Sequence, residues 1–306
     1  MANIYFDSSM SDEERRQKIF EGDIFVLSPT AASLELCALA EEILKEAFAP
    51  YDPETAQDHM PVEQFASILA EVKPQFIHHP GCKHLIPQVL DSAGCDLEKN
   101  YFDVPRLRTS TAKNYLTTGI AYAFHPHRDT WYSAAQCQIN WWMPVRPVRS
   151  DNCMSFYPKY FSSPVKNGSS NYDYYRWNKE NRKDAARHIG KDTRVQPKPE
   201  EDLELAPDLR LVTPVGALIL FSAAQLHASV ENTSLRTRLS IDFRVVNRDD
   251  VASMTGARNV DSSCTGTALR DFLRCTDLER LPEDLVRPYD HVEPTKDAIT
   301  VYQPDS

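Results

Sequence analysis

The sequence predicts one mainly β-sheet domain with helices packed outside the sheets. Residues 1–100 carry the apolar spacing of amphipathic helices, whereas 101–247 contain short segments rich in β-branched and aromatic residues. One long polar insertion, 158–206, interrupts those segments. A helical layer followed by many short strands is typical of double-sheet barrels and jelly rolls. Because no linker or change of composition marks a boundary, we expect a single domain over 1–306 that ends in a polar tail, 248–306.

The N-terminal third is expected to form a mostly helical support layer. In chain order, its helices are predicted at residues 12–20, 31–48, 61–76 and 84–93, with a strand at 23–27. Ser11 is available as the N-cap of the first helix. The second helix has the strongest apolar stripe, and Pro50 and Pro53 end it because proline cannot continue a helix.

Strands are expected over most of the remaining chain, because short β-rich runs alternate with turn signals. In chain order they cover 103–110, 111–124, 134–145, 152–157, 208–213, 217–221, 226–231 and 235–247. The insertion is predicted to hold some helix near 176–188, and another helix is expected at 266–275. Long ordered loops are often lids or substrate loops, so the aromatic cluster 172–177 either closes over substrate or packs the insertion onto the sheets.

Composition restricts the classes of function. The formal net charge is −10, so the chain has no general attraction for nucleic acid or anionic membranes. No apolar run approaches the roughly 20 residues of a membrane span, and the N-terminus lacks a secretory signal pattern. Seven cysteines without a CxxC motif favour reduced thiols. We therefore expect a cytoplasmic protein whose partner is a small-molecule substrate, and the oligomeric state stays open.

A candidate metal site is formed by residues of two separate segments. His127 and Asp129 are two positions apart, so they share one face of an extended chain. His227 lies 98 residues beyond Asp129, just after an apolar strand. Two histidines and one carboxylate on one face of an octahedral ion leave positions open, which is typical of non-haem iron(II) oxygenases.

A carboxylate anchor follows eleven residues after the second histidine. Arg238 and Ser240 share a strand face, and a guanidinium with a hydroxyl suits the distal carboxylate of 2-oxoglutarate. Arg236 is the alternative anchor, because it lies on the same face as Arg238. His125 competes in the same way as a metal ligand, although a supporting hydrogen bond is the role we favour for it.

Taken together, these residues resemble the iron(II)- and 2-oxoglutarate-dependent dioxygenases, in particular the phytanoyl-CoA hydroxylase and ectoine hydroxylase branch, over about residues 20–247. The resemblance implies a double-stranded β-helix core, which is a jelly-roll or cupin-like fold, with iron held by His127, Asp129 and His227. It implies that Asn114, Phe124, Ser229, Arg238 and Ser240 contact 2-oxoglutarate. It also implies oxidation of a substrate C–H bond by O2 with release of succinate and CO2. Related halogenases carry a small residue in place of the carboxylate, so Asp129 favours hydroxylation or another oxygenase outcome.

Candidate substrate contacts come from the segment after the metal motif and from the last strand. Gln138, Asn140 and Trp142 share one face, which lines either a wet cavity or the solvent. Thr130, Trp131 and Arg244 are further candidates, each of which could instead serve in packing. Local arginine, amide and aromatic side chains favour a small polar metabolite or natural-product intermediate as the substrate.

Two other classes of function and one other metal site remain as alternatives. The first class is a metal-binding cupin-like enzyme that does not use 2-oxoglutarate, and the second is a non-catalytic binding protein on the same fold. The grouped residues His78, His79, Cys82 and His84 match no closed four-ligand pattern, so we do not expect zinc there.

Overall fold

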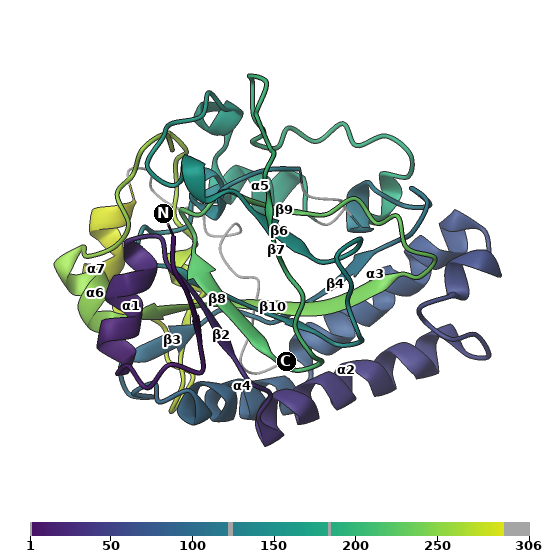
Figure 1. The fold of residues 1–306 in the computed structure, drawn as a ribbon, viewed down its shortest axis with the longest axis horizontal. Helices are drawn as coiled ribbons and strands as arrows, with labels where there is room; N and C mark the ends of the chain where they lie inside the picture. The colour runs from purple at the N-terminus through teal and green to yellow at the C-terminus, as the bar shows by residue number, and fades with distance from the viewer. Residues whose placement is uncertain (1, 122–124, 183–184, 291–306) are drawn as a thin grey trace.

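The computed structural model describes residues 2–121, 125–182 and 185–290, and Phe124 lies outside these ranges. Two sheets form its centre (Figure 1). The large sheet has the order β1 (Ile4–Phe6), β2 (Ile24–Leu27), β8 (Leu218–Ser222), β5 (Ile139–Pro144), β10 (Arg238–Asn247), β3 (Asn100–Phe102), β11 (Leu273–Arg274), with β4 (Arg106–Ser110) also paired to β10. The small sheet has the order β7 (Leu209–Leu211), β6 (Met154–Phe156), β9 (His227–Ser229). The prediction of a mainly sheet fold with helices is confirmed.

The helices lie outside the two sheets. The α-helices are α1 (Asp12–Phe20), α2 (Ala31–Phe48), α3 (Val62–His78), α4 (Pro80–Ser92), α5 (Tyr174–Glu180), α6 (Arg248–Ser253) and α7 (Glu283–Val286). Short 3-10 helices cover Ala56–Asp58, Gly119–Ala121, Asp129–Tyr132, Pro158–Tyr160, Gly168–Asn171, Ala185–Arg187, Ala268–Asp271 and Arg287–Tyr289. In Figure 1, α2, α3 and α4 run beneath the large sheet, while α1, α6 and α7 gather at one end.

One face of β10 joins the sheet to the helices. Leu239, Ile241 and Phe243 are buried on this face, in the same apolar core as Leu36 of α2 and Phe65 of α3. Successive side chains of a strand point to opposite faces. The intervening residues of β10 therefore point away from the helices and toward the small sheet, and they are the polar set Arg238, Ser240, Asp242 and Arg244.

A second apolar core fills part of the space between the two sheets. Trp142, Ile219 and Phe221 of the large sheet pack there with Met154 and Phe156 of the small sheet. This packing fixes the distance and register between the sheets, because protein interiors are close-packed and tolerate few voids. The polar row of β10 therefore lies in a space whose walls are rigid.

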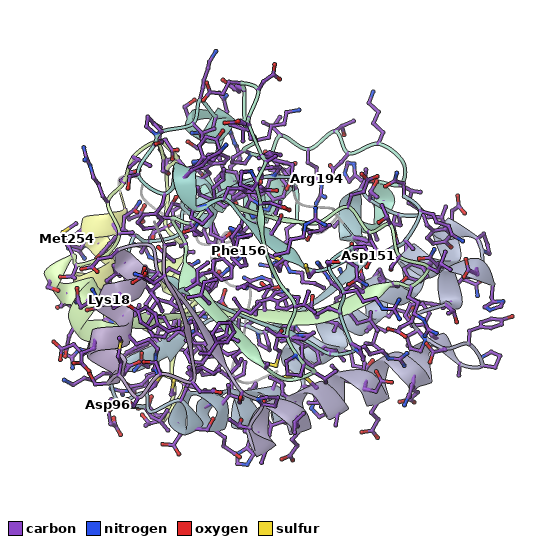
Figure 2. The ribbon with its side chains drawn as sticks, viewed as in Figure 1. Lys18, Asp96, Asp151, Phe156, Arg194 and Met254 are labelled. Carbon is purple, nitrogen blue, oxygen red and sulfur yellow. The ribbon has the colours of Figure 1, made fainter. Side chains whose placement is uncertain are left out.

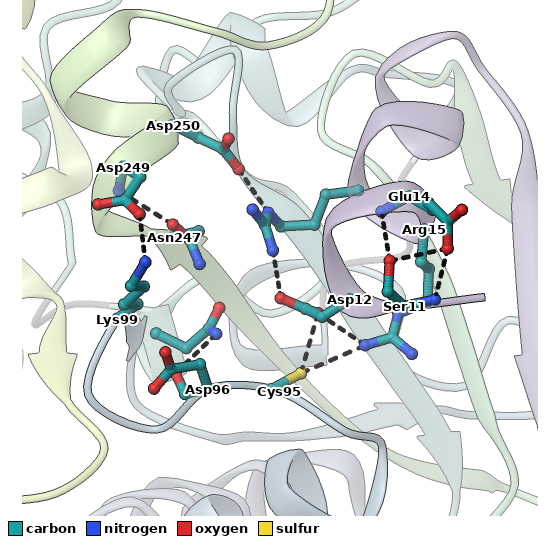
Figure 3. A network of polar contacts seen from close by, with 12 residues as sticks. Ser11, Asp12, Glu14, Arg15, Cys95, Asp96, Lys99, Asn247, Asp249 and Asp250 are labelled. Carbon is teal, nitrogen blue, oxygen red and sulfur yellow. Dashed lines mark hydrogen bonds and ion pairs between the residues drawn. The ribbon is translucent and has the colours of Figure 1, made fainter. Parts of the chain in front are cut away.

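Helix α1 is tied to the end of β10 by a polar network (Figure 3). Ser11 forms the expected N-cap as a reciprocal capping box. Arg16 contacts Asp12 one turn earlier and donates from Nε to Oδ2 of Asp250 in α6 at 2.6 Å. Lys99 pairs with Asp249 beside it at 2.8 Å. These contacts hold the N-terminal helix against the chain that leaves the last long strand.

Two predicted elements differ from the structure. The part of 111–124 that the structure describes contains turns and a 3-10 helix in place of a strand, so that prediction is wrong. Lys113 and Asn114 both have a φ of 53°, a left-handed conformation that breaks an extended chain. The helix predicted at 266–275 is also wrong, because this segment forms the 3-10 helix Ala268–Asp271 followed by β11.

Among the residues that the structure describes, no helix combines the length and the apolar character that crossing a bilayer requires.

Candidate metal centre

The two histidines of the predicted triad are joined through their backbones. His127 and His227 form an antiparallel bridge, in which each residue's N–H donates to the other's carbonyl at 3.0 Å. His227 begins β9, whose register to β6 places it opposite Phe156. Asp129 follows after one extended residue and begins the 3-10 helix Asp129–Tyr132. The fold thus brings a loop and a strand, about a hundred residues apart, to one point.

The side chains of His127, Asp129 and His227 converge. Oδ1 of Asp129 lies 3.4 Å from Nε2 of His127 and 3.9 Å from Nε2 of His227. All three ligand atoms lie within 4.8 Å of one another. Neighbouring ligands of an octahedral ion with bonds of roughly 2.1 Å stand about 3 Å apart, so this separation suits a single cation.

Hydrogen bonds fix which nitrogen of each imidazole faces the centre. Nδ1 of His127 lies 2.9 Å from the carbonyl oxygen of His125, and Nδ1 of His227 lies 2.9 Å from that of Gln225. A carbonyl oxygen only accepts hydrogen bonds, so in the neutral ring Nδ1 carries the proton and Nε2 keeps its lone pair. Burial, followed by the neighbouring His127 ring, lowers the pKa of His227 to about 4, which keeps it neutral at physiological pH.

The donor set fits a divalent cation. Two imidazole lone pairs and one carboxylate oxygen point at a common place, where they repel one another unless a positive charge lies between them. Burial opposes ionisation of Asp129, but the adjacent His127 ring and the Arg244 guanidinium outweigh it and hold its pKa well below the ordinary value. Two histidines with one carboxylate is the set that non-haem iron(II) prefers, with zinc and other first-row ions as competitors.

The ring of His125 is directed to the insertion. Its Nε2 lies 3.0 Å from the carbonyl oxygen of Pro197, and burial lowers its pKa to about 4. Its own carbonyl oxygen is the group that orients His127. These contacts favour the supporting role that the sequence suggested for His125 over the role of a ligand.

Apolar rings enclose the second histidine. The ring of His227 packs against Phe221 at 4.8 Å between centroids and against Phe156 at 6.4 Å. Phe156, labelled near the middle of the view in Figure 2, is fully buried in the core between the two sheets. On the other side, the ring of Tyr132 meets His127 edge-on at 5.7 Å. The hydrophobic surroundings of a metal site limit access of water to it.

Arg238 is a buried cation beside this centre. Only 5% of it is exposed, and Nη1 donates to the carbonyls of Asn152 at 3.2 Å and Cys153 at 3.4 Å. Nη2 donates to Oγ of Ser229 at 3.2 Å, while Nε has no hydrogen-bond partner. Among the residues that the structure describes, none forms an ion pair with this guanidinium. Burial lowers its pKa to about 10, so the group remains charged at neutral pH.

Of the other predicted co-substrate residues, Ser229 contacts Arg238, Ser240 shares its strand and Asn114 lies elsewhere on the cavity wall. Ser240 is fully buried two positions along β10, and its hydroxyl has no partner. Asn114 is exposed and donates to Glu231 at 3.4 Å. A cavity of about 160 Å³ opens beside these groups; its lining includes Ser110, Thr111, Asn114, His125, Ser229 and Asn232. Arg236, the alternative anchor, is largely exposed and paired with Glu54 at 2.8 Å, so these contacts favour Arg238.

The predicted substrate contacts divide into two groups. Gln138 and Asn140 are buried and joined by a hydrogen bond of 3.0 Å, and in the register of the sheet Asn140 lies opposite Arg244. In contrast, Trp142 belongs to the core between the sheets, with the Arg238 guanidinium 5.8 Å from its ring centroid. The structure therefore favours a packing role for Trp142.

Thr130 and Trp131 are enclosed by other segments. Nε1 of Trp131 donates to Asp261 at 2.7 Å, and the ring is completely buried. The carbonyl of Thr130 accepts from Ser262 at 2.5 Å, and its N–H donates to Ala223 at 3.2 Å. These contacts account for both residues as anchors of the metal loop, which is the packing alternative considered for them.

Two acidic residues near the centre were not identified from the sequence. Asp103 pairs with Arg244 at 3.1 Å, and Asp261 pairs with Arg128 at 3.0 Å. Arg128 lies between the two motif residues His127 and Asp129, and none of its side chain is exposed. The signal in the sequence is the position of Arg128 between two metal-motif residues that are expected to be buried. A charged side chain in such a place usually needs a buried partner.

No second group suited to a metal is found in the described parts of the chain. His79 instead caps α4, where its Nδ1 accepts from Gly81 at 3.0 Å. The sulfur of Cys82 is directed to the carbonyl of Phe76 at 3.1 Å. His79 and Cys82 of the rejected zinc site therefore serve the junction between α3 and α4.

Comparison with solved structures finds distant similarities. EvdO2 from Micromonospora carbonacea var. aurantiaca, complexed with 2-oxoglutarate, is 11% identical over 78% of this chain and 92% of that chain, with a TM-score of 0.43. The epimerase SnoN, in complex with Fe3+, alpha ketoglutarate and nogalamycin RO, is 12% identical over 77% and 85%, with a TM-score of 0.41. The non-heme alpha ketoglutarate dependent carbocyclase SnoK is 13% identical over 78% and 85%, with a TM-score of 0.37.

Sequence comparison gives no match, either to a family model or to a curated protein. At these identities and TM-scores, the activities of the three structures do not transfer to this chain. What the chain does is therefore inferred from its own site.

Proposed function

We propose that this protein is an iron(II)- and 2-oxoglutarate-dependent oxygenase that oxidises a C–H bond of a small polar metabolite. One observation carries the proposal: a triad of His127, Asp129 and His227 lies near Arg238, a buried guanidinium that pairs with no carboxylate among the residues that the structure describes. The triad can bind a metal and leave some of its coordination positions open. The guanidinium can bind an anionic co-substrate.

The environment of Arg238 supports an anionic ligand. A buried charge is costly unless it is paired, and the hydrogen bonds of this guanidinium within the described ranges go to two carbonyls and one hydroxyl. Its Nε and the Ser240 hydroxyl are both buried, and neither has a hydrogen-bond partner in the part of the chain that the structure describes. A guanidinium binds a carboxylate with two parallel hydrogen bonds, and an adjacent hydroxyl can donate a third.

The spacing between the two groups supports a short dicarboxylate. Arg238 contacts Ser229, which lies two residues after His227 on the same face of β9. Two residues of a strand span roughly 7 Å. A five-carbon keto diacid has a comparable length, so it can bind the metal at one end and Arg238 at the other.

The chain itself binds, orients and excludes water. Iron(II) with 2-oxoglutarate and O2 supplies the oxidising power when bound. The carbonyls of His125 and Gln225 hold the imidazoles in the orientation that a metal requires. Phe156 and Phe221 keep the second histidine dry. The buried amides of Gln138 and Asn140 offer hydrogen bonds that would suit a polar substrate.

A metal-binding cupin-like protein without 2-oxoglutarate is the second candidate. Such a protein needs the triad but has no use for a buried, unpaired guanidinium one strand away. The buried charge of Arg238 suits an anionic ligand, so it favours the 2-oxoglutarate-dependent oxygenase over this second candidate. Iron binding without succinate release, across a panel of metabolites, would favour the second candidate.

The test is anaerobic titration of the iron(II)-loaded protein with 2-oxoglutarate, followed by the weak visible charge-transfer band of the chelate. We expect the band in the natural protein. Arg238→Met should weaken 2-oxoglutarate binding by about 30-fold or more, because losing one partner of a buried charge pair costs 2 kcal/mol or more. Arg236→Met is the matched control and should remain within about twofold, because that exposed residue pairs with Glu54.

Two results would overturn the proposal. The first is an iron-loaded natural protein that forms no band at any 2-oxoglutarate concentration. The second is equal 2-oxoglutarate binding by the Arg238→Met and Arg236→Met variants. Succinate release in the presence of candidate metabolites then identifies the substrate.

A further inference from the structure

We propose that Arg244 is a positioning residue that makes Asp129 bind the metal through one oxygen only. This inference rests on the proposed function in one respect, namely that the triad binds a metal. Nε of Arg244 lies 3.5 Å from Oδ2 of Asp129, while Oδ1 of the same carboxylate faces the two histidines. The two oxygens of Asp129 thus have different neighbours.

Arg244 is held in place by Asp103. The backbone N–H of Arg244 donates to Oδ1 of Asp103 at 2.8 Å, and its Nη1 donates to Oδ2 at 3.1 Å. The backbone N–H of Asp103 donates back to the carbonyl of Arg244 at 3.0 Å. Asp103 is only 2% exposed. Backbone and side chain of Arg244 thus both bind Asp103, which holds the guanidinium beside the metal centre.

The charge of Arg244 acts on one carboxylate oxygen. A guanidinium attracts the nearer oxygen, and burial strengthens this attraction because few water molecules screen it. The Arg244 guanidinium lies between two carboxylates, 3.1 Å from Oδ2 of Asp103 and 3.5 Å from Oδ2 of Asp129, and a guanidinium stays cationic in proteins. Oδ2 is thereby kept on the side of Arg244, and Oδ1 is left for the cation.

One-oxygen binding decides how many positions of the metal stay open. Carboxylates bind hard cations through one oxygen or both. With two imidazoles and one oxygen, an octahedral ion keeps three positions, enough for a two-atom chelator and a third ligand. If both oxygens of Asp129 bound, one of those positions would be lost. Arg244 therefore controls how many coordination positions of the metal stay open, in addition to the position of one ligand.

The test counts the water molecules on Mn(II), which replaces iron without any need for substrate or 2-oxoglutarate. Water-proton relaxation of the saturated Mn(II) complex reports the coordinated waters. In the natural protein we expect three. In Arg244→Met the freed Oδ2 should displace one, and the relaxation enhancement should fall by about one third.

Arg106→Met is the matched control. Nη1 of Arg106 pairs with the same Oδ2 of Asp103 at 2.6 Å, but Arg106 makes no contact with Asp129 in the described structure. Its variant should therefore keep the water count of the natural protein. Arg244→Lys retains the charge without the planar fork, so it should restore part of the lost relaxation. Thermal unfolding of each variant verifies that it is folded.

Equal relaxation in the Arg244→Met, Arg106→Met and natural Mn(II) complexes would overturn this inference. A loss of equal size in Arg106→Met would also overturn it, because Asp103 would then be the group that matters. A natural protein with three waters that never forms the 2-oxoglutarate band, together with a one-third loss in Arg244→Met, would support this inference while the proposed co-substrate failed.

Discussion

Each of the three converging side chains is oriented by a second group. The carbonyl of His125 orients one imidazole, and the carbonyl of Gln225 orients the other. The guanidinium of Arg244 lies beside the far oxygen of Asp129. Groups behind metal ligands typically change metal affinity by about 10- to 100-fold when they are removed. At the scale of single residues, the centre is defined by these pairs.

Removal of Asp129 should abolish metal binding. Asp129→Ala leaves two neutral imidazoles without the only negative charge of the triad, so Mn(II) affinity should fall by more than the roughly 100-fold upper range of supporting residues. Fluorescence or calorimetric titration measures the affinity. His125→Gln is the control, because its ring lies against Pro197, and its affinity should change only a few-fold. A comparable loss in the control would place His125 among the ligands.

Asp271 should make stability depend on pH. Burial raises its pKa to about 6, although the hydroxyl of Tyr174, which donates to it, acts in the opposite direction. The folded state therefore binds a proton more strongly than the unfolded state, whose carboxyl has a pKa near 4. The stability that this proton confers is present below about pH 4 and is lost as the pH rises to about 6.

The measurement compares the natural protein with Asp271→Asn by urea unfolding at pH 4.5 and pH 7.5. The neutral amide cannot ionise. The free energy of unfolding of Asp271→Asn, relative to that of the natural protein, should therefore increase with pH. A gain of about 2–3 kcal/mol follows from a pKa difference of about two units at 1.36 kcal/mol each. A relative stability that is the same at both pH values would contradict the assignment.

At the scale of elements, Asp261 joins three segments. Its side chain accepts from Arg128 and Trp131 of the metal loop, at 3.0 and 2.7 Å. It also accepts from the backbone of Val165 at 3.0 Å, at the start of the insertion. The side chain of Arg128 completes the junction by donating to the carbonyl of Ser163 at 2.9 Å. The tail, the insertion and the metal loop thus meet at one carboxylate.

Replacement of Asp261 should destabilise the whole junction. Asp261→Asn keeps the shape but leaves the fully buried charge of Arg128 unpaired, which typically costs about 3–5 kcal/mol. Urea unfolding measures the change. Asp277→Asn breaks the exposed pair with Arg274 and should change stability by less than about 1 kcal/mol. If both variants lost equally little, the junction would not contribute to stability.

Local signals explain which elements the sequence could predict. The helix predicted at 31–48 has these bounds in the structure, because its apolar stripe and Pro50 are both local features. The strand predicted at 111–124 failed because β-rich composition does not reveal the left-handed turn at Asn114. The helix predicted near 176–188 is shorter in the structure: α5 begins earlier, at Tyr174, because Asp173 caps it, and it ends at Glu180.

The same distinction applies to the site. The separation of two positions between His127 and Asp129 is visible in the sequence, and the structure brings both to His227. Their binding of a metal stays a prediction. The pairing of Asp103 with Arg244 depends on residues 141 positions apart in chain order, so no pattern in the sequence could indicate it.

At the scale of the whole molecule, two apolar cores surround the polar row of β10 that contributes to the site. The larger core packs the helices against one face of β10, and the smaller core fills part of the space between the sheets. The polar row of Arg238, Ser240, Asp242 and Arg244 is left between the sheets. Two of its largely buried charges have partners, since Asp242 pairs with Arg108 at 2.5 Å and Arg244 pairs with Asp103 at 3.1 Å.

Metal binding should stabilise the whole molecule. A ligand that binds only the folded state adds about 2.7 kcal/mol when its free concentration is 100 times Kd. We therefore expect Mn(II) to raise the midpoint of thermal unfolding, and a chelator to reverse the change. Asp129→Ala should show no increase, and an equal increase in this variant would place the stabilising ion elsewhere.

The backbone bridge between residues 127 and 227 has a consequence for the speed of metal uptake. Main-chain hydrogen bonds already hold the backbones of both histidines side by side. An arriving ion therefore needs little rearrangement of the chain. Rapid mixing with Mn(II) should then give a single phase whose rate increases in proportion to ion concentration. A rate that levels off at high ion concentration would reveal a slow opening step. The backbone bridge would then have to open before the ion can bind.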